Sequence, residues 1–533
     1  MPSDCITFRD TNFFSSLICD YLDKKETLKP FYNRFPDIDN FKEQIEEKGM
    51  SVRTQSRTIL VSSLQQQYQD VDASSETLNN IEALSNSNTF TVTTGHQLNL
   101  FTGPLYFLYK IVSAINLSKE LKVKYPEYNF VPVYWMATED HDFDEINYFN
   151  FKGKKIQWNQ ASEGGVGRLE TEGLDEVFKV FSSELNSSHN ANRIKELFEN
   201  AYLNHNSLTK ATRYLANELF KSYGLVIVDG DDANLKQLFV PYINEELHKN
   251  IAVSKVNTTS EALENLSNEY KIQVNPRDIN LFYLKDNLRE RIVFEDAIFK
   301  VNNTSIEFTK DEILIEVENH PLRFSPNVIM RPLYQEVILP NLCYIGGGGE
   351  LAYWFQLKDF FNSQEVPFPM LLLRNSVLIQ TEKQKQKLEK LNISKKEIFL
   401  KQDSLINKKV REISDIEIDF SEQKNYLEAQ FKSLHELAKQ TDLSFSGAVK
   451  AEEVRQLKGL KNLEKRLLKA QKRKLVDEVS RMVAVQNQLF PNKSLQERNT
   501  NFSEFYLEYG DSLIPRLIKE LKPLQGDFAI ITV

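Results

Sequence analysis

The chain has 533 residues, of which 41% are hydrophobic and 26% charged, with 18 glycines and 17 prolines. Glycine is about half as frequent as the usual ~7%, which excludes collagen-like, linker-rich and low-complexity proteins, and the hydrophobic fraction excludes a wholly disordered chain. The net charge of −9 disfavours a general binder of nucleic acid or of anionic membranes.

Targeting signals and cysteine pairs are not visible in the sequence. No basic segment followed by an apolar run opens the chain, and no window approaches 18 consecutive apolar residues. Cys5, Cys19 and Cys343 form no C-x-x-C pair. We therefore expect a cytoplasmic protein with free thiols and with neither membrane nor nucleic-acid partners.

The first 375 residues predict an α/β core. After a polar, helical stretch up to residue 85, the run 89–95 is β-rich, 104–122 has helical spacing, and 130–137 is short, apolar and aromatic. This order predicts a βαβ unit with a right-handed crossover. Buried strands are also expected at 225–230, 341–345 and 369–374, and the segments 147–205 and 250–320 are predicted insertions.

Residues 376–495 predict a helical coiled-coil domain, because glycine nearly vanishes and leucines recur every seven residues. A helix over 448–490 would be about 60 Å long and needs a partner. We expect an antiparallel hairpin with the 421–441 helix, which a second subunit could complete. The basic run LKAQKRKL of the 448–490 helix is read as a solvated face. Residues 496–533 are expected to return to the core, with FAIITV as a strand that could join the core sheet.

Two loops after predicted strands carry candidate site residues. In TTGHQLNLFTGPL (93–105), His96 and Gln97 follow a strand and Gly103-Pro104 precede a helix, a context that suits ligand binding but also an ordinary turn with a capping histidine. In ATEDHDFDEIN (137–147), His141 lies between Asp140 and Asp142 and could act as a base near neutral pH. A solvated acidic loop is the alternative, and carboxylates of this kind can also bind a hard metal, although no H-E-x-x-H or comparable spacing supports a zinc site.

A third loop, YIGGGGELAYW (344–354), fits G-x-G-x-x-A between a strand and a helix. The next strand ends in Arg374 rather than in the acidic residue of NAD sites, so the loop favours a phosphate or carboxylate, with Glu350 available for an amine. Asn327 and Arg331 precede the loop, and Arg331 and Arg374 are either anion clamps or structural ion pairs. No P-loop and no G-x-S-x-G motif is present.

In order along the chain, TGHQLNLFTGPLYFLYK, PVYWMATEDHDFDEIN, SPNVIMRPLYQEVILPN and YIGGGGELAYWFQLK resemble the bacillithiol synthase family, also called cysteine ligase BshC. The resemblance covers nearly the whole chain and departs at His96, where glutamine is expected in much of the family. It implies a Rossmann-like core with connecting-peptide insertions, similar to class I aminoacyl-tRNA synthetases, and a coiled coil that forms a homodimer. It also implies the last step of bacillithiol biosynthesis, an amide bond between cysteine and glucosaminyl-malate.

The resemblance and the loops together give a set of expected site residues. His141 is the expected base, supported by Asp140 or Asp142, and no metal ligand is expected. Substrates are expected to bind through Gly95, His96, Gln97, Gly103, Pro104, Glu139, Asp144, Asn327, Arg331, Gly346, Gly347, Gly348, Gly349, Glu350, Tyr353 and Arg374. The cofactor is unknown, with ATP/ADP and Mg²⁺ as an option because a carboxylate does not acylate an amine unaided. A nucleotidyl-transferring enzyme and a non-catalytic nucleotide-binding scaffold are the alternatives.

Overall fold

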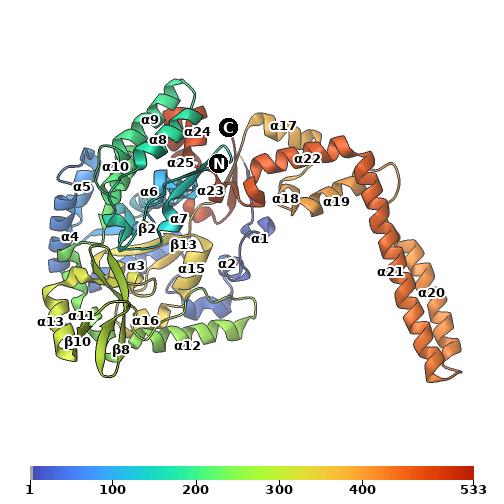
Figure 1. Ribbon diagram of the computed structural model, residues 1–533, viewed down its shortest axis with the longest axis horizontal. Helices are drawn as coiled ribbons and strands as arrows, with labels where there is room; N and C mark the ends of the chain where they lie inside the picture. Colours follow the sequence, from blue (N-terminus) through green and yellow to red (C-terminus); the bar gives the residue numbers. More distant parts are fainter. Residues whose placement is uncertain (1–3) are drawn as a thin grey trace. The chain divides into compact units, whose positions relative to one another are not determined.

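The computed structural model describes residues 4–533 of the chain, which form two compact units (Figure 1). The first unit contains Phe13–Leu378, Leu495–Ile531 and the N-terminal residues up to Arg9. The second unit contains Ile379–Ser494 with Asp10–Asn12 and the last two residues. The chain thus leaves the first unit after residue 378 and re-enters it at residue 495.

A parallel five-stranded sheet forms the centre of the first unit. Its strands in chain order are β2 (Thr89–His96), β3 (Asn129–Met136), β6 (Val226–Asp229), β12 (Asn341–Gly346) and β13 (Met370–Leu373). They lie side by side in the order β13-β12-β2-β3-β6, and every neighbouring pair is parallel. This is the doubly wound order of a Rossmann-like fold, in which the strand order reverses beside the first strand. The predicted Rossmann-like sheet is therefore confirmed.

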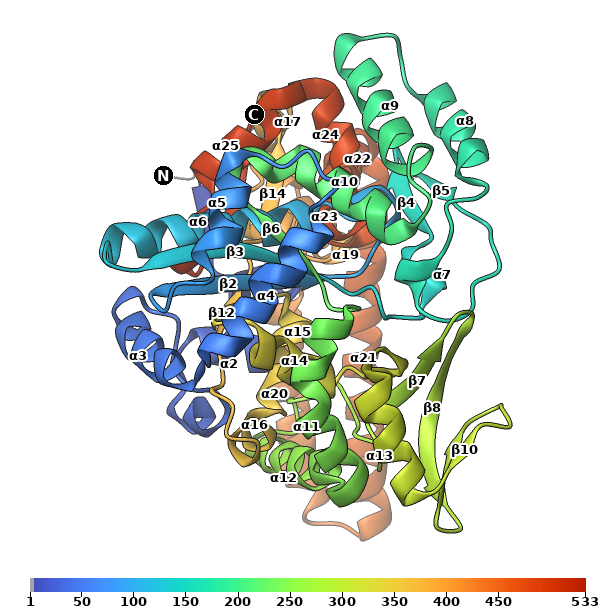
Figure 2. The same ribbon diagram turned by 90° about the vertical axis from the view of Figure 1, so that its left-hand side faces the viewer.

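Helices enclose the sheet, and its central strands are buried on both faces. All eight residues of β2 are buried, as are all residues of β12 and β13, which is typical of a parallel sheet enclosed by helices. Helix α6 (Tyr106–Lys124) makes the crossover from β2 to β3 and packs on both strands (Figure 2). The core there joins α3 (Phe41–Ser51), α6 and four of the strands.

Smaller sheets stand outside the parallel one. An antiparallel sheet has the order β10-β9-β8-β7-β11, and β4 and β5 form a hairpin. FAIITV forms β15, which pairs with β1 and does not join the parallel sheet, so that part of the expectation was wrong. The bounds are β1 (Asp4–Ile6), β4 (Tyr148–Phe151), β5 (Lys154–Gln157), β7 (Leu281–Lys285), β8 (Leu288–Glu295), β9 (Ile298–Val301), β10 (Glu307–Phe308), β11 (Phe324–Pro326), β14 (Val377–Gln380) and β15 (Phe528–Thr532).

The remaining helices before residue 378 and after residue 495 surround these sheets. They are α1 (Phe8–Thr11), α2 (Ser16–Leu22), α4 (Thr54–Gln67), α5 (Ser75–Ala83), α7 (Phe143–Ile146), α8 (Leu174–Glu184), α9 (His189–Tyr202), α10 (Leu208–Phe220), α11 (Ala233–Lys249), α12 (Ile251–Leu266), α13 (Lys310–Asn319), α14 (Met330–Ile338), α15 (Gly348–Phe355), α16 (Lys358–Ser363), α23 (Gln496–Asn499), α24 (Phe502–Tyr509) and α25 (Leu513–Glu520). Among residues 4–533, no helix combines the length and apolar character needed to span a membrane.

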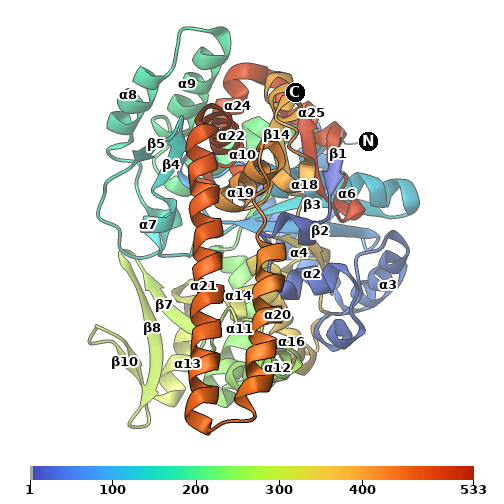
Figure 3. The same ribbon diagram turned by 90° about the vertical axis from the view of Figure 1, so that its right-hand side faces the viewer.

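The second unit is helical and contains the expected antiparallel hairpin (Figure 3). Its helices are α17 (Glu382–Lys390), α18 (Lys395–Ile398), α19 (Gln402–Ile413), α20 (Ser421–Ala438), α21 (Leu443–Lys474) and α22 (Val476–Leu489). Helices α20 and α21 pack through Leu427, Phe431, Ala438 and Val449. The single helix expected over 448–490 is instead broken at Leu475, whose ψ of 34° is not helical, and the residues around the break pack on α19.

Candidate active site

Three loops of the first unit meet where the strand order reverses. They follow β2, β3 and β12, and parallel strands place their carboxyl ends at the same edge of the sheet. A cavity of about 420 Å³ lies there, lined by residues from all three loops, from α14 and from the end of β13. Open α/β sheets bind their ligands at this position, so the cavity is the candidate active site.

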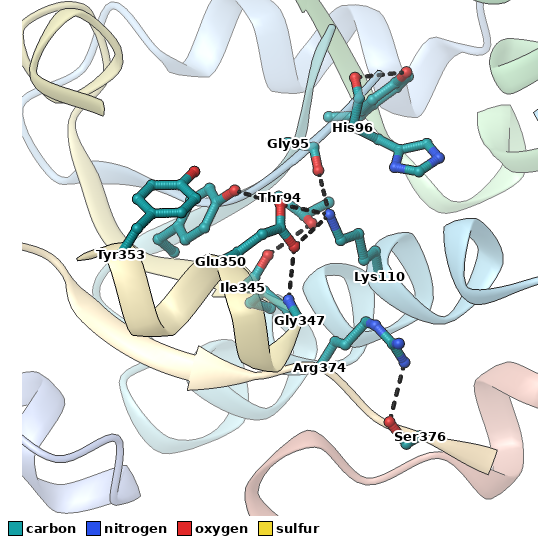
Figure 4. Close-up of polar contacts among 12 residues, drawn as sticks. Thr94, Gly95, His96, Lys110, Ile345, Gly347, Glu350, Tyr353, Arg374 and Ser376 are labelled. Atoms are coloured by element: carbon teal, nitrogen blue, oxygen red, sulfur yellow. Dashed lines mark hydrogen bonds and ion pairs between the residues drawn. The ribbon is translucent and has the colours of Figure 1, made fainter. Parts of the chain in front are cut away.

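An ion pair between Lys110 of α6 and Glu350 of α15 links the end of β2 to the glycine loop after β12 (Figure 4). The Lys110 ammonium, on α6, donates to the Gly95 carbonyl at 2.7 Å and lies 2.7 Å from a Glu350 carboxylate oxygen. Glu350 also accepts from the Gly347 N–H at 2.7 Å and from the Tyr344 hydroxyl at 3.1 Å. The side chain of Lys110 is 3% exposed and that of Glu350 is 29% exposed.

The charges of this pair perturb each other. Burial lowers the pKa of Lys110, and the Glu350 carboxylate opposes that change. Burial acts to raise the pKa of Glu350, but the Lys110 charge and the Gly347 N–H outweigh it and hold that pKa below its ordinary value. The contacts of Glu350 with Lys110 and with the Gly347 N–H fix the glycine loop in place.

One wall of the cavity is cationic. Arg331 donates to the Tyr353 hydroxyl at 2.8 Å. Arg374 pairs with Glu497 at 2.7 Å, while its Nε is buried without a hydrogen-bond partner among the described residues. Gly348 and Gly349 open helix α15 on the cavity, and the first N–H groups of a helix favour anions. This wall suits carboxylate or phosphate groups.

The opposite chemistry comes from the loop after β3. Glu139 forms an ion pair with the buried Lys236, which also donates to the Phe324 carbonyl at 2.7 Å. Asp140 accepts from the Gln97 amide at 2.9 Å. Both carboxylates line the cavity, and they give it an acidic wall that suits an ammonium group.

The two carboxylates of the acidic wall differ in their pKa. Burial raises the pKa of Glu139, and the charge of Lys236 only partly offsets it. Burial also acts to raise the pKa of Asp140, but hydrogen bonds from the His141 backbone N–H, at 2.8 Å, and from the Gln97 amide, together with the charge of Arg289, hold that pKa well below its ordinary value. Glu139 is therefore the better proton acceptor and Asp140 the more permanent negative charge.

His141 lies outside the lining of the cavity, and its ring is half exposed. Its Nδ1 accepts a hydrogen bond from the Arg289 guanidinium at 2.7 Å. A guanidinium can only donate, so Nδ1 is the acceptor and the hydrogen of the neutral ring sits on Nε2. In this arrangement neither ring nitrogen has a free lone pair for a substrate proton.

His96 is buried beside the cavity and uncharged. Burial and the charges of Lys110 and Arg374 lower its pKa well below the ordinary value. Its Nε2 has no hydrogen-bond partner among the described residues, and its ring packs against Tyr106 and Phe107. These surroundings favour a packing role for the side chain over proton transfer.

A short segment after residue 495 completes the site. We call Glu497–Asn501 the clamp segment. Glu497 holds Arg374, and Arg498 lines the cavity. The Asn501 amide donates to the carbonyls of Phe101 and Gly103 at 2.7 and 2.6 Å. The clamp segment therefore fixes the loop after β2 although it lies some 400 residues later in the chain.

That loop is strained. Phe101, Thr102 and Gly103 all have positive φ, at 47°, 67° and 60°. Such conformations cost non-glycine residues about 1–3 kcal/mol each and persist where the surrounding structure holds them. Besides Asn501, the Tyr202 hydroxyl accepts from the Phe101 N–H at 2.8 Å. Strain of this kind concentrates at functional sites.

Most of the expected site residues meet at the cavity. Those that line it are Gly95, His96, Gln97, Glu139, Asp140, Asn327, Arg331, Gly347, Gly348, Gly349, Glu350, Tyr353 and Arg374. Gly103 and Pro104 line a second cavity. Gly346, at the end of β12, accepts from the Arg374 N–H, and the loop residues His141, Asp142 and Asp144 line neither cavity.

Sequence reasoning missed several lining residues, among them Tyr106, Lys110, Trp135, Arg289, Tyr344 and Arg498. Lys110 had a usable signal, because it is a charged residue within the apolar run of α6 and a lysine is rarely buried without a partner. Arg498 had no signal, since nothing nearby in the sequence ties it to the loops. Within residues 4–533, no group of three or more His, Cys, Asp or Glu residues is arranged to hold a metal ion.

Comparisons with known proteins identify the family. Residues 1–375 match the family described as "Bacillithiol biosynthesis BshC, N-terminal Rossmann-like domain", and residues 377–533 match "Bacillithiol biosynthesis BshC, C-terminal coiled-coil domain". A protein of Flavobacterium johnsoniae named "Putative cysteine ligase BshC" is 61% identical over 533 residues, covering 100% of both chains. One of the same name from Cytophaga hutchinsonii is 40% identical, covering 97% of this chain and 96% of its own. The chain belongs to the BshC family.

A solved structure was also found, titled as a putative arginyl t-RNA synthetase from Campylobacter jejuni. It covers 86% of this chain and 100% of its own, with 11% identity and a TM-score of 0.21. A likeness at this level supports no conclusion about fold or function. The synthetase-like character of the core stays a prediction.

Proposed function

From its membership of the BshC family, we propose that this chain is a ligase that joins L-cysteine to glucosaminyl-malate through an amide bond, as the last step of bacillithiol biosynthesis. The family descriptions name bacillithiol biosynthesis, and the relatives are named as cysteine ligases. The observation that carries the proposal is the charge of the cavity, whose lining has both a group of cationic side chains and a group of carboxylates.

The two walls match the charges of the two substrates. Malate carries two carboxylates, which Arg331, Arg374 and the start of α15 would bind. Cysteine and glucosamine each carry an amine, which Glu139 and Asp140 would hold as ammonium. Both reactants would then lie in one cavity with the cysteine carboxylate and the sugar amine close together, as amide formation requires.

The amine must lose a proton before it attacks. We assign this proton to Glu139, because its carboxylate lines the cavity and burial raises its pKa. His141, the base expected from sequence, has its Nδ1 lone pair occupied by Arg289. Asp140 would contribute a fixed negative charge that stabilises the ammonium form on binding.

Amide formation from a carboxylate and an amine releases water and needs an activated carboxylate. ATP with Mg²⁺ is the simplest activating co-substrate. The test incubates the purified protein with glucosaminyl-malate and cysteine, with and without ATP and Mg²⁺, and follows products by mass spectrometry. The expected result is a product heavier than glucosaminyl-malate by one cysteinyl residue. AMP or ADP release would identify the activation chemistry.

The same experiment decides between this proposal and the alternatives. Transfer of a nucleotide to a substrate without an amide product would indicate a nucleotidyl-transferring enzyme, and no product under any condition would indicate a scaffold. We further propose a cytoplasmic homodimer that forms through the coiled-coil hairpin of α20 and α21. The exposed leucines at 434, 437, 443 and 463 of these helices support that part of the proposal.

A further inference from the structure

A second cavity of about 310 Å³ lies next to the candidate active site. The two share Gln97, Tyr106 and Arg498 in their linings. The second cavity adds residues from the strained loop after β2 and from strand β4, which belongs to the first insertion. The two cavities are therefore neighbours, with these three residues at their common border.

The chemistry of the second cavity differs from that of the first. Its lining is rich in carboxamides, contributed by Gln97, Asn99, Asn150 and Asn499, and it has one acidic residue, Glu145, and one basic residue, Arg498. Carboxamides both donate and accept hydrogen bonds, as hydroxyl groups do. The first cavity instead has several arginines, a lysine and three carboxylates. The second cavity thus suits a neutral, hydroxyl-bearing group.

Aromatic side chains supply the rest of the lining. Tyr106, Tyr148 and Phe149 all line the second cavity. Aromatic rings offer a flat apolar surface, with a hydroxyl at the edge in the case of tyrosine. A hexose presents both kinds of surface, since its C–H groups form apolar patches and its hydroxyls point outward.

One residue that lines this cavity, Asn99, has an unmet hydrogen bond. Asn99 is more than nine-tenths buried, and its amide nitrogen donates to the Glu145 carbonyl at 3.2 Å. Its Oδ1 has no partner among residues 4–533. A buried acceptor left unpaired costs about 1–3 kcal/mol, a cost that a ligand hydroxyl would remove.

We propose that the second cavity is the subsite for the hexosamine ring of the substrate, while the first cavity holds the dicarboxylate attached to it; this rests on the proposed function. Malate is joined to C1 of the sugar and the amine is on C2. With malate against the cationic wall and the ring in the second cavity, the C2 amine lies at the shared residues. There it is beside Gln97 and beside the Asp140 carboxylate, which accepts a hydrogen bond from the Gln97 amide.

Calorimetry with three ligands tests this subsite, using malate, methyl α-glucosaminide and glucosaminyl-malate. The Asn150→Trp variant fills the second cavity, and Glu170→Trp, at an exposed position outside both cavities, is its matched control. We expect Asn150→Trp to weaken glucosaminyl-malate binding more than tenfold, to abolish glucosaminide binding and to leave malate binding within twofold of the wild type. Asn150→Ala, which removes only the amide, should weaken glucosaminyl-malate binding about 2- to 12-fold.

The outcomes separate the subsite from the reaction. Equal loss of malate and glucosaminyl-malate binding in Asn150→Trp and Asn150→Ala would overturn the subsite, and so would unchanged binding of glucosaminyl-malate. If the wild type binds neither the glucosaminide nor glucosaminyl-malate, the subsite is also overturned. If the glucosaminide binds and is displaced by Asn150→Trp while no amide product forms with cysteine and ATP, the subsite stands and the ligase proposal fails.

Discussion

The ion pair of Lys110 and Glu350 allows the sharpest test of how the site is held together. Lys110→Met leaves the Glu350 carboxylate without its cation, and Glu350→Met leaves an ammonium that is 3% exposed with the Gly95 carbonyl as its remaining partner. Breaking a buried pair by removing one partner costs about 3–5 kcal/mol. In Lys110→Met the unpaired group is Glu350, which is 29% exposed and can still contact water. We therefore expect Lys110→Met to lower the free energy of unfolding by about 3 kcal/mol and Glu350→Met to lower it by about 5 kcal/mol.

The double variant distinguishes the pair from its separate members. Replacing both members of a buried pair by apolar side chains of similar volume often changes the free energy of unfolding little. The cost of the double variant is then that of the Gly347 N–H and the Tyr344 hydroxyl, which lose their acceptor, about 1–3 kcal/mol. We therefore expect the double variant to be more stable than Glu350→Met alone. The two single costs add up to about 8 kcal/mol, so with a double-variant cost of about 1–3 kcal/mol the coupling free energy from the cycle should be about 5–7 kcal/mol.

The measurement is urea unfolding followed by tryptophan fluorescence. All three tryptophans, Trp135, Trp158 and Trp354, lie in the first unit, so the signal reports on the unit that contains the pair. Lys119→Met, on the exposed side of the same helix, is the control and should change stability by no more than about 0.5 kcal/mol. Additive effects of the two substitutions, within about 0.5 kcal/mol, would refute the assignment of a coupled pair.

The remaining predictions concern the base, the second unit and the hairpin. Glu139→Gln should lower kcat/KM by about 10²–10⁴-fold, and His141→Ala should lower it by less than tenfold. In the wild type, activity should fall as pH drops through the raised pKa of Glu139, because the base becomes protonated. A larger loss of kcat/KM in His141→Ala than in Glu139→Gln would restore His141 as the base. Burial acts to raise the pKa of Glu397, but hydrogen bonds from Lys408, Ser394 and Lys409 lower it to about 2. A depressed carboxyl pKa stabilises the fold above the unfolded value of about 4.5, and that contribution is lost as pH falls towards about 2. Circular dichroism melts should show this loss in the wild type and in Glu389→Gln but not in Glu397→Gln, and identical profiles would contradict it. Deleting Ser421–Lys474, the hairpin of α20 and α21, should yield a monomer in analytical ultracentrifugation, and a dimer that persists would exclude this interface.

The parallel sheet was predictable because most of its strands are short apolar runs, while β2 is rich in the β-branched residues Thr and Val, and polar or glycine-rich loops follow them. That pattern located Gly95, Gln97, Glu139 and Gly347, since parallel strands bring their carboxyl ends to one edge. The pairing of β15 with β1 was not predictable, because an apolar run does not specify its neighbour. The break at Leu475 was also hidden, since leucines repeat every seven residues across it.

The site residues that sequence missed depend on distant parts of the chain. Arg498 reaches the cavity only because Glu497 and Asn501 are anchored on either side of it, to Arg374 and to the loop after β2. The obstacle to His141 as a base is equally remote in sequence, since Arg289 comes from the second insertion. Local sequence patterns identify side chains that can transfer protons or bind charged groups. Only the tertiary structure shows which of their lone pairs are already occupied by hydrogen bonds from distant residues.

The late position of the clamp segment has a consequence for biosynthesis. A ribosome makes about 5–20 residues per second and domains tend to fold from the N-terminal side, so the parallel sheet is complete in sequence once residue 373 has been made, well before Glu497–Asn501 emerge. Until then Arg374 has no counter-ion and the strained loop has no Asn501 to hold it. A nascent or prematurely terminated chain that lacks residues 497–501 would therefore carry the sheet without a finished pocket.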